Sequence, residues 1–290
     1  MPTALLTATI ELGAQRPGDG QIPLAPVLHA DHTAALVMVI AAFAGAAAAL
    51  VWALVKLVRG GETLPLVLLA AGVVAANMEP LGDHVGLIVY APDVPWFDYW
   101  LMGRQMPSFI AVGEASYIAF GGYYAYRMLA TGRSVGRVVL ISAVLVGIPE
   151  ILVEVGWHHW GIISYYGDNP TRILGVPLYS IVQNSTLLPV LGLVAFLGAE
   201  HLRGVQRLWL VIAVPAVTIG YIVGVSWPVY VAIQSSAAAP IAWAAALVTC
   251  AASIGGAWAA INYPAVRRLR KAAAGGPAPA TSPATATAAA

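Results

Sequence analysis

The sequence predicts an all-α fold, a polytopic membrane bundle of seven transmembrane helices. First, 60% of the residues are hydrophobic and 9% are charged, whereas a soluble domain is usually ~25% charged. Second, seven apolar stretches reach the ~20 residues that a spanning helix needs. Third, the basic residues alternate between the two sides of these stretches, as the topology of a membrane protein requires.

The spans define one transmembrane domain over residues 33–263, with no internal repeat. We expect residues 1–32, which carry Gly and Pro, to be an extracytoplasmic lead-in. Residues 272–290 are rich in Ala, Gly, Pro and Thr, and are expected to be a disordered tail. The predicted spans are residues 33–58, 64–90, 107–129, 138–160, 173–199, 208–232 and 240–262.

The distribution of Lys and Arg predicts the orientation of the bundle. Of the 14 basic residues, Arg16, Arg104 and Arg172 fall on one side of the predicted spans. The others share the opposite side, which the positive-inside rule assigns to the cytoplasm. The N-terminus is therefore expected outside and the C-terminus in the cytoplasm of a bacterial plasma-membrane protein. The cytoplasmic set is Lys56, Arg59, Arg127, Arg133, Arg137, Arg203, Arg207, Arg267, Arg268, Arg270 and Lys271.

Several function classes find no support in the sequence. The net charge of +1 gives no reason to expect a nucleic-acid partner. Cys250 is the single cysteine, so an internal disulfide is excluded. A rhodopsin would need a lysine within the seventh span, but Lys56 and Lys271 both lie at cytoplasmic ends. A phosphate-binding Gly-Lys loop and an Asp-rich diphosphate motif are absent from the sequence.

Acidic residues inside the predicted spans mark the candidate catalytic site. A charge in hydrocarbon costs at least ~2.5–3.5 kcal/mol, so such residues usually face a protein interior and serve a function. With a rise of ~1.5 Å per residue, three spans of alternating direction place these acids at one level, in the outer half of the membrane. The acids are Glu79, Asp83, Glu114, Glu150 and Glu154.

The spacing of these acids indicates acid–base chemistry. Glu79 and Asp83 are four residues apart and share a helix face, as do Glu150, Glu154 and His158. Two carboxyl groups one turn apart in a low dielectric do not both ionise easily, which leaves a protonated acid beside a carboxylate base. This arrangement suits proton transfer to or from an apolar substrate.

Aromatic residues in the outer loops are expected to cover this site. Residues 91–100, which include Trp96, and residues 161–170, which include Tyr165, lie at the same predicted level as Trp157 and Trp227. They fit an aromatic belt at the membrane surface, and they also fit a cage that stabilises a cation. We expect Asn184 in the fifth span to contact the substrate as well. Arg104 is expected to pair with an acid or to bind an anionic group.

Residues 149–177 read PEILVEVGWHHWGIISYYGDNPTRILGVP. This stretch resembles membrane carotenoid hydratases and, more loosely, integral-membrane carotenoid and terpene cyclases. The resemblance implies an acid that protonates an isoprenoid alkene, with water or a second alkene capturing the cation. It departs from the family pattern at Trp157, His158 and His159. The matching positions are Glu154, Gly156, Gly161, Tyr165, Gly167, Gly175, Val176 and Pro177.

The first hypothesis is therefore an enzyme that cyclises or hydrates a lipophilic terpenoid in an outer-leaflet cavity. Glu154 or Glu150 would donate the proton, Glu79 or Asp83 would accept one, and His158 would relay it, without cofactor or metal. The expected partners are a lipophilic small molecule and the lipid bilayer. Two alternatives remain: a proton-coupled transporter or lipid-binding protein that uses the same acids, and a lipid hydrolase with a Glu/His metal site.

Overall fold

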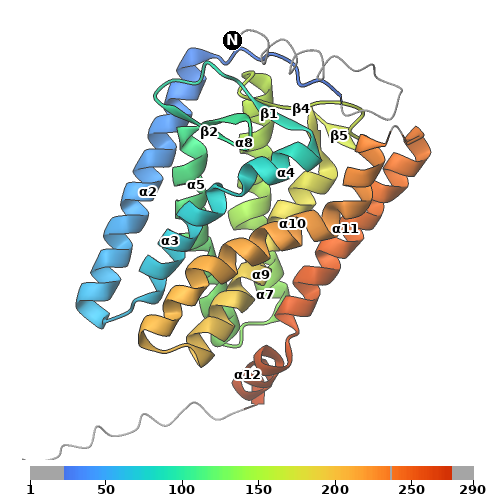
Figure 1. Cartoon of the computed structure of the whole chain (residues 1–290). Helices are drawn as coiled ribbons and strands as arrows, with labels where there is room; N and C mark the ends of the chain where they lie inside the picture. Colours follow the sequence, from blue (N-terminus) through green and yellow to red (C-terminus); the bar gives the residue numbers. More distant parts are fainter. Residues whose placement is uncertain (1–22, 236, 276–290) are drawn as a thin grey trace, which may run out of the picture.

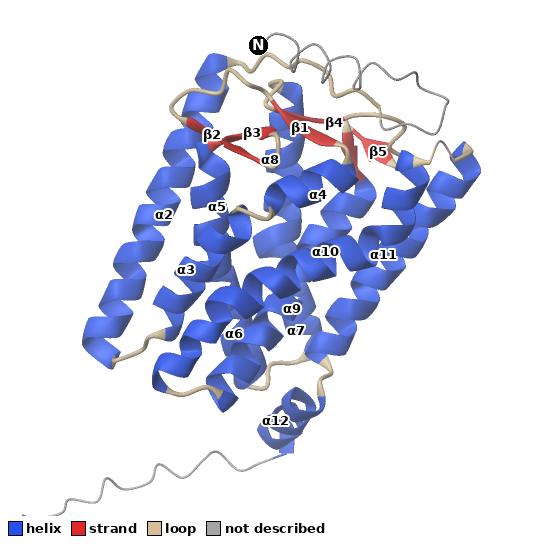
Figure 2. Cartoon of the chain, viewed as in Figure 1, coloured by secondary structure: helices blue, strands red, loops and turns tan. Residues whose placement is uncertain are grey.

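The computed structural model describes residues 23–235 and 237–275, and they form a bundle of helices (Figure 1). Small strands cross one end of the bundle, which we call the capped end, and α12 lies beyond the other (Figures 1 and 2). The helices are α2 (His32–Gly60), α3 (Leu64–Ala76), α4 (Glu79–Gly86), α5 (Ser108–Tyr117), α6 (Tyr123–Ala130), α7 (Val135–Ser142), α8 (Ile148–His159), α9 (Leu178–His201), α10 (Leu210–Gln234), α11 (Ala239–Ile261) and α12 (Pro264–Gly275).

The helices confirm a predominantly α-helical, multi-pass membrane protein. Among the described residues, five helices are long and apolar enough to cross a membrane, or six if the bent pair α3 and α4 forms one span. The third predicted span, residues 107–129, is helical as α5 and α6 but does not belong to this set. The total of seven spans and the outside location of the N-terminus therefore stay predictions.

The second predicted span is broken, which sequence periodicity did not indicate. α3 ends at Ala76, and α4 starts at Glu79 with its axis turned by 42°. Pro80 follows the first residue of α4, where its missing N–H costs nothing and its ring disfavours continuation of the preceding helix. Helix α4 then ends at Gly86 rather than residue 90. Because of this break, the end of α3 and the start of α4 lie within the bundle rather than at one of its two surfaces (Figure 1).

Two further spans contain short π-helical segments. Segment η1 (Ile118–Gly122) joins α5 to α6, and η2 (Ala143–Gly147) joins α7 to α8. A π-helical turn inserts an extra residue into the helix, rotates the side chains that follow, and frequently lies at a functional site. Both segments adjoin predicted catalytic acids, since Glu114 precedes η1 and Glu150 follows η2.

The loops that were expected to cover the site form three two-stranded antiparallel sheets at the capped end (Figure 2). The β1–β4 sheet pairs Ile88 with Tyr165 and Tyr90 with Ile163. The other two sheets, β2–β3 and β5–β6, are local hairpins, and the sequence analysis did not predict any of these strands. The strands are β1 (Ile88–Tyr90), β2 (Asp98–Leu101), β3 (Arg104–Pro107), β4 (Ile163–Tyr165), β5 (Arg172–Ile173) and β6 (Val176–Pro177).

The structure describes only part of each predicted chain end. Residues 23–31 of the expected lead-in have no helix or strand, and residues 1–22 lie outside the described residues. The expected tail begins too early, because residues 272–275 belong to α12. Residues 276–290 of that tail also lie outside the described residues.

The interior of the bundle is apolar and closely packed at the end away from the sheets. A short 3₁₀ segment, η3 (Gly204–Trp209), leads into α10 there. Leu64, Leu68, Leu191 and Val214 are buried together between α3, α9 and α10. This core closes the bundle on the side of α12, whereas the polar interior lies near the capped end.

Candidate active site

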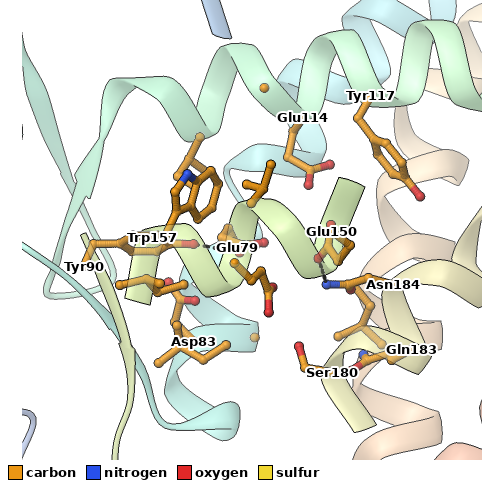
Figure 3. Close-up of a pocket in the computed structure, with 18 of the residues that line it drawn as sticks. Glu79, Asp83, Tyr90, Glu114, Tyr117, Glu150, Trp157, Ser180, Gln183 and Asn184 are labelled. Carbon is orange, nitrogen blue, oxygen red and sulfur yellow. Dashed lines mark hydrogen bonds between the residues drawn. The ribbon is translucent and has the colours of Figure 1, made fainter. Parts of the chain in front are cut away.

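The predicted acids from three helical segments meet in one cavity of about 240 Å³ beneath the sheets, which we call the acid cavity. Figure 3 shows Glu79, Asp83, Glu114 and Glu150 directed at this common space from α4, α5 and α8. None of the described side chains that line it is Lys, Arg or His. Its polar and aromatic lining comprises Glu79, Asp83, Glu114, Glu150, Glu154, Tyr90, Tyr117, Tyr165, Tyr230, Phe109, Trp157, Ser180, Gln183 and Asn184.

Five buried carboxyl groups without a lining cation cannot all be ionised. The cost of removing a charge from water is several kcal/mol even after the protein relaxes, and neighbouring carboxylates would repel one another. Glu150 and Glu154 are one helical turn apart on α8, so a proton on one of them would relieve the repulsion between them. We therefore expect the acid cavity to hold carboxylic acids beside carboxylates.

The β1–β4 sheet supplies two tyrosines to the lining of the cavity. Because side chains alternate along a strand, Tyr90 and Tyr165 share the sheet face that lines the cavity. The Tyr90 hydroxyl donates to Glu79 Oε1 over 3.3 Å. Burial raises the pKa of both phenols well above its usual value, so they remain neutral donors.

Glu154 has the most developed set of contacts among the acids. The Tyr165 hydroxyl lies 2.9 Å from both carboxylate oxygens of Glu154 and 2.9 Å from Ser180 Oγ. One turn earlier on α8, Glu150 accepts a hydrogen bond from Asn184 Nδ2. The position of Glu154 is therefore fixed by a network that reaches α9, which is the kind of support that a reacting group needs.

Other polar atoms of the acid cavity have no protein partner. Both oxygens of Asp83, Oε2 of Glu114 and the Tyr117 hydroxyl are buried without a hydrogen bond among the described residues. Buried polar groups in folded proteins are nearly always satisfied by protein, water or ligand. These unpaired atoms on one cavity therefore indicate that a polar molecule, water included, occupies it.

A group of aromatic rings also lines the cavity. The Phe109 ring lies between Tyr90 and Trp157, with ring centroids 6.1 Å and 5.1 Å away. The faces of such rings attract cations, and the attraction increases in the absence of water. A positive charge that develops in this cavity would thus lie close to aromatic rings as well as to carboxyl groups.

Main-chain breaks explain how the acids reach the cavity. Glu79 is the first residue of α4, directly after the bend that ends α3. Glu114 and Tyr117 lie in the last turn of α5, before η1. At Gly72 of α3, a β-carbon would come within 2.6 Å of the Ala115 Cα atom, so this close contact fixes the backbone beside Glu114.

Three of the substrate-binding residues proposed from the sequence lie outside the acid cavity. Trp227 is 57% exposed on the outer surface of α10, and Trp96 is exposed and packs on Phe43. Arg104 donates to the Ile88 carbonyl and the Tyr166 hydroxyl, and forms no ion pair with Asp98 or Glu114 among the described residues. Its structural role is to attach β3 to β1 and the β4 segment.

His158 also lies outside the cavity and does not continue the carboxyl stripe of α8. Its ring packs against Gly175 in the β5–β6 turn, where a β-carbon would come within 1.9 Å of the ring. With φ of +90°, Gly175 also has a backbone conformation that favours glycine. This packing contact, rather than a role in proton relay, explains the presence of His158 and Gly175 in the 149–177 stretch.

The structure places further groups in the cavity that the site prediction lacked, among them Tyr90, Tyr117 and Ser180. Tyr117 follows Glu114 by three residues on one helix, a spacing that could have revealed it. Ser180 precedes Asn184 by one turn in the same way. Tyr90 carries no sequence signal, because its position depends on the pairing of strands far apart in the chain.

The described residues contain no group of three or more His, Cys, Asp or Glu side chains arranged to hold a metal ion. Cys250, His158 and His159 all lie away from the carboxyl groups of the acid cavity. The Glu/His ligand set of the hydrolase alternative is therefore not assembled. No protein-family model, curated protein or solved structure matches this chain.

Proposed function

We propose that this protein is an integral-membrane enzyme that cyclises or hydrates a lipophilic isoprenoid alkene by acid–base chemistry. The observation that carries the proposal is the convergence of five carboxyl groups and an aromatic wall on one cavity without a lining cation. Such a cavity can donate a proton, stabilise a cation and accept a proton within one enclosed space. The resemblance of residues 149–177 to carotenoid hydratases and terpene cyclases supports the same chemistry.

The reaction begins with proton transfer from a carboxylic acid, which we assign to Glu154 or Glu150. The π electrons of the alkene form the new C–H bond, and the neighbouring carbon becomes a carbocation beside Phe109 and Trp157. Tyr165 and Ser180 hold the donor in place. After protonation of the alkene, the donor is left as a carboxylate.

A second electron pair then captures the cation. In cyclisation another alkene of the same substrate forms a C–C bond, and a carboxylate, Glu79 or Asp83, removes a proton from the adjacent carbon. In hydration a water molecule forms a C–O bond and loses its extra proton to the same base. The oxygens of Asp83 have no hydrogen-bond partner among the described residues, which leaves them available as the base.

The test is a comparison of lipids extracted from cells that express the wild-type protein, Glu154→Gln or no protein, by mass spectrometry. Cyclisation gives a product of unchanged mass, and hydration gives a product heavier by one water. Glu200→Gln, at an exposed acid of α9, is the matched control and should retain full conversion. Full conversion by Glu154→Gln would remove the proposed donor.

The transporter alternative finds less support from the packing. A transported molecule needs access to both membrane faces. The buried core of Leu64, Leu68, Leu191 and Val214 closes the bundle between the acid cavity and the end near α12. Uptake of a lipid without chemical change, dependent on Glu154, would favour transport over catalysis.

A further inference from the structure

A second hollow lies beside the acid cavity, on the outer surface of the bundle. This lateral groove has a volume of about 670 Å³ and lies between α2, the η1–α6 segment and η2. Phe120 is 39% exposed and Leu145 is 53% exposed, so the groove opens outward, where the apolar helices meet lipid. Its lining includes Gly45, Trp52, Phe120, Gly121, Tyr124 and Leu145.

Two side chains line both the lateral groove and the acid cavity. Tyr117 and Val146 line both hollows, so these side chains form the partition between them. The hydroxyl of Tyr117 has no hydrogen-bond partner among the described residues, so only apolar packing holds its ring in place. A rotation of this one side chain would connect the two spaces.

The lining of the groove indicates a hydrocarbon occupant. Lys56 is its one charged lining residue among those described, and its charge is already compensated. The ammonium lies 3.6 Å from the Glu62 carboxylate and 5.5 Å from the centre of the Tyr123 ring. The remaining walls are mostly aromatic, aliphatic or glycine, so they offer contact area rather than polar recognition.

The dimensions favour a long chain. From Gly45 to Lys56, the groove follows α2 over ~16 Å at the helical rise of ~1.5 Å per residue. The acid cavity of about 240 Å³ is smaller than the ~300–1,000 Å³ of ordinary ligand sites. It can therefore enclose one end of a large lipid, and the rest of that molecule must lie elsewhere.

We propose that the lateral groove holds the hydrocarbon chain of a long, linear isoprenoid whose reactive alkene end enters the acid cavity between Tyr117 and Val146. The substrate thus comes directly from the membrane, through the side of the bundle, and the β1–β4 sheet remains closed during entry. This inference rests on the proposed function for the identity of the reaction, but the location of the chain can be tested without turnover.

The experiment uses the full chain in lipid nanodiscs with a linear tetraprenyl alcohol that carries a diazirine beside its hydroxyl carbon. With the alkene end in the acid cavity, photolysis should label Trp52 in the groove. Trp258 of α11, which is 64% exposed on the outer surface, reports labelling by free lipid. We expect labelling of Trp52 to exceed that of Trp258 and to fall when unlabelled alcohol is added in excess.

Gly45→Leu is the variant that fills the groove. A β-carbon at Gly45 would lie 3.5 Å from Ser116 Oγ, an ordinary contact, so the larger side chain should extend into the groove without moving the helices. Ala47→Leu, exposed on the opposite face of α2, is the matched control. In Gly45→Leu the added side chain would occupy the space of the bound hydrocarbon chain, so we expect photolabelling of Trp52 to fall about tenfold. Labelling should not change in Ala47→Leu.

If Gly45→Leu fails to fold, Leu145→Trp narrows the groove from its exposed wall and serves the same purpose. Equal Trp52 labelling in the blocked and control variants, or labelling of Trp52 no stronger than that of Trp258, would overturn the inference. Such a result together with conversion that depends on Glu154 leaves the proposed function standing. Groove-specific labelling together with full conversion by Glu154→Gln removes the proposed function and retains the groove.

Discussion

Glu154 differs from the other acids of the cavity in that one hydroxyl, that of Tyr165 in the β1–β4 sheet, contacts both of its carboxylate oxygens. Ser180, in the first turn of α9, contacts the same Tyr165 hydroxyl and so holds it in position. Asp83 and the Oε2 atom of Glu114, by contrast, have no protein partner among the described residues. The cavity thus combines one rigidly held acid with others free to bind water or substrate.

Replacing Tyr165 with Phe tests whether this orientation matters. The ring would remain, but the hydrogen bonds to Glu154 and Ser180 would be lost. Since a positioned acid or base typically contributes ~10²–10⁴-fold to a rate, we expect a loss of ~10-fold or more in conversion, with wild-type expression. Tyr90→Phe, which removes the 3.3 Å bond to Glu79, is the comparison. Unchanged conversion by Tyr165→Phe would show that Glu154 needs no such support.

Gly113 gives a separate test of cavity volume. It lines the acid cavity, and a β-carbon there would meet no atom within 4 Å. Gly113→Ala should therefore stabilise α5 by ~0.5–1 kcal/mol, the usual difference between these residues in a helix. Gly113→Leu should also fold but fill the cavity, so conversion should be lost. Thermal unfolding and lipid analysis of both variants check this, and normal conversion by Gly113→Leu contradicts the assignment of the cavity.

At the scale of single elements, irregular segments position the site, while the regular helices provide the frame. The bend between α3 and α4 brings Glu79 to a helix start, and η1 and η2 adjoin Glu114 and Glu150. The turns over the cavity depend on equally specific contacts. Among them, Gly175 of the β5–β6 turn packs directly on His158 of α8.

We expect Gly175→Ala to destabilise the protein through two separate effects. A positive φ costs an alanine ~1–2 kcal/mol, and the clash with the His158 ring adds ~1–3 kcal/mol for overpacking. His158→Ala removes the clash alone, so the double variant should recover part of the lost stability. Unfolding of the four proteins in a double-mutant cycle measures the coupling. No coupling would mean that the two residues do not touch.

The contacts between the β1–β2 loop and the segment before α2 predict that the stability of the fold depends on pH. The Ala30 N–H donates to Asp93 over 2.9 Å and His29 lies 3.2 Å from the same carboxylate. These contacts lower the pKa of Asp93, the first being the larger cause. A lowered folded-state pKa stabilises the fold above the ordinary value of ~3.9 and loses this effect as pH falls through the lowered pKa.

Asp93→Asn should therefore be less stable than the wild type near neutral pH, by a small amount because the carboxylate is exposed. The difference should shrink as the solution becomes more acidic than the ordinary Asp value, when the wild-type carboxyl is protonated as well. Melting temperatures across this range give the comparison, with exposed Asp168→Asn as the control. A difference that grows in acid would have the wrong sign for this contact.

For the whole molecule, sequence reasoning located the acids because a carboxyl group in an apolar span is costly and must face inward. It also placed Glu79 with Asp83 and Glu150 with Glu154 on shared faces by simple periodicity. It could not place Tyr90 beside Glu79, since β1 pairs with a strand more than seventy residues later. Helix periodicity likewise gave no sign of η1 or η2, whereas Pro80 is a local signal for the bend that the span prediction did not use.

The orientation of the bundle is the remaining property that sequence predicts at this scale. The basic residues near the end at α12 assign that end to the cytoplasm, so the acid cavity should lie near the opposite, extracytoplasmic surface. In a Cys250→Ala background, we expect Asp168→Cys at the capped end to react with a membrane-impermeant maleimide on intact cells. Arg133→Cys, exposed between α6 and α7, should react after permeabilisation. The reverse pattern would place the acid cavity at the cytoplasmic face, where the protons it exchanges would come from the cytoplasm.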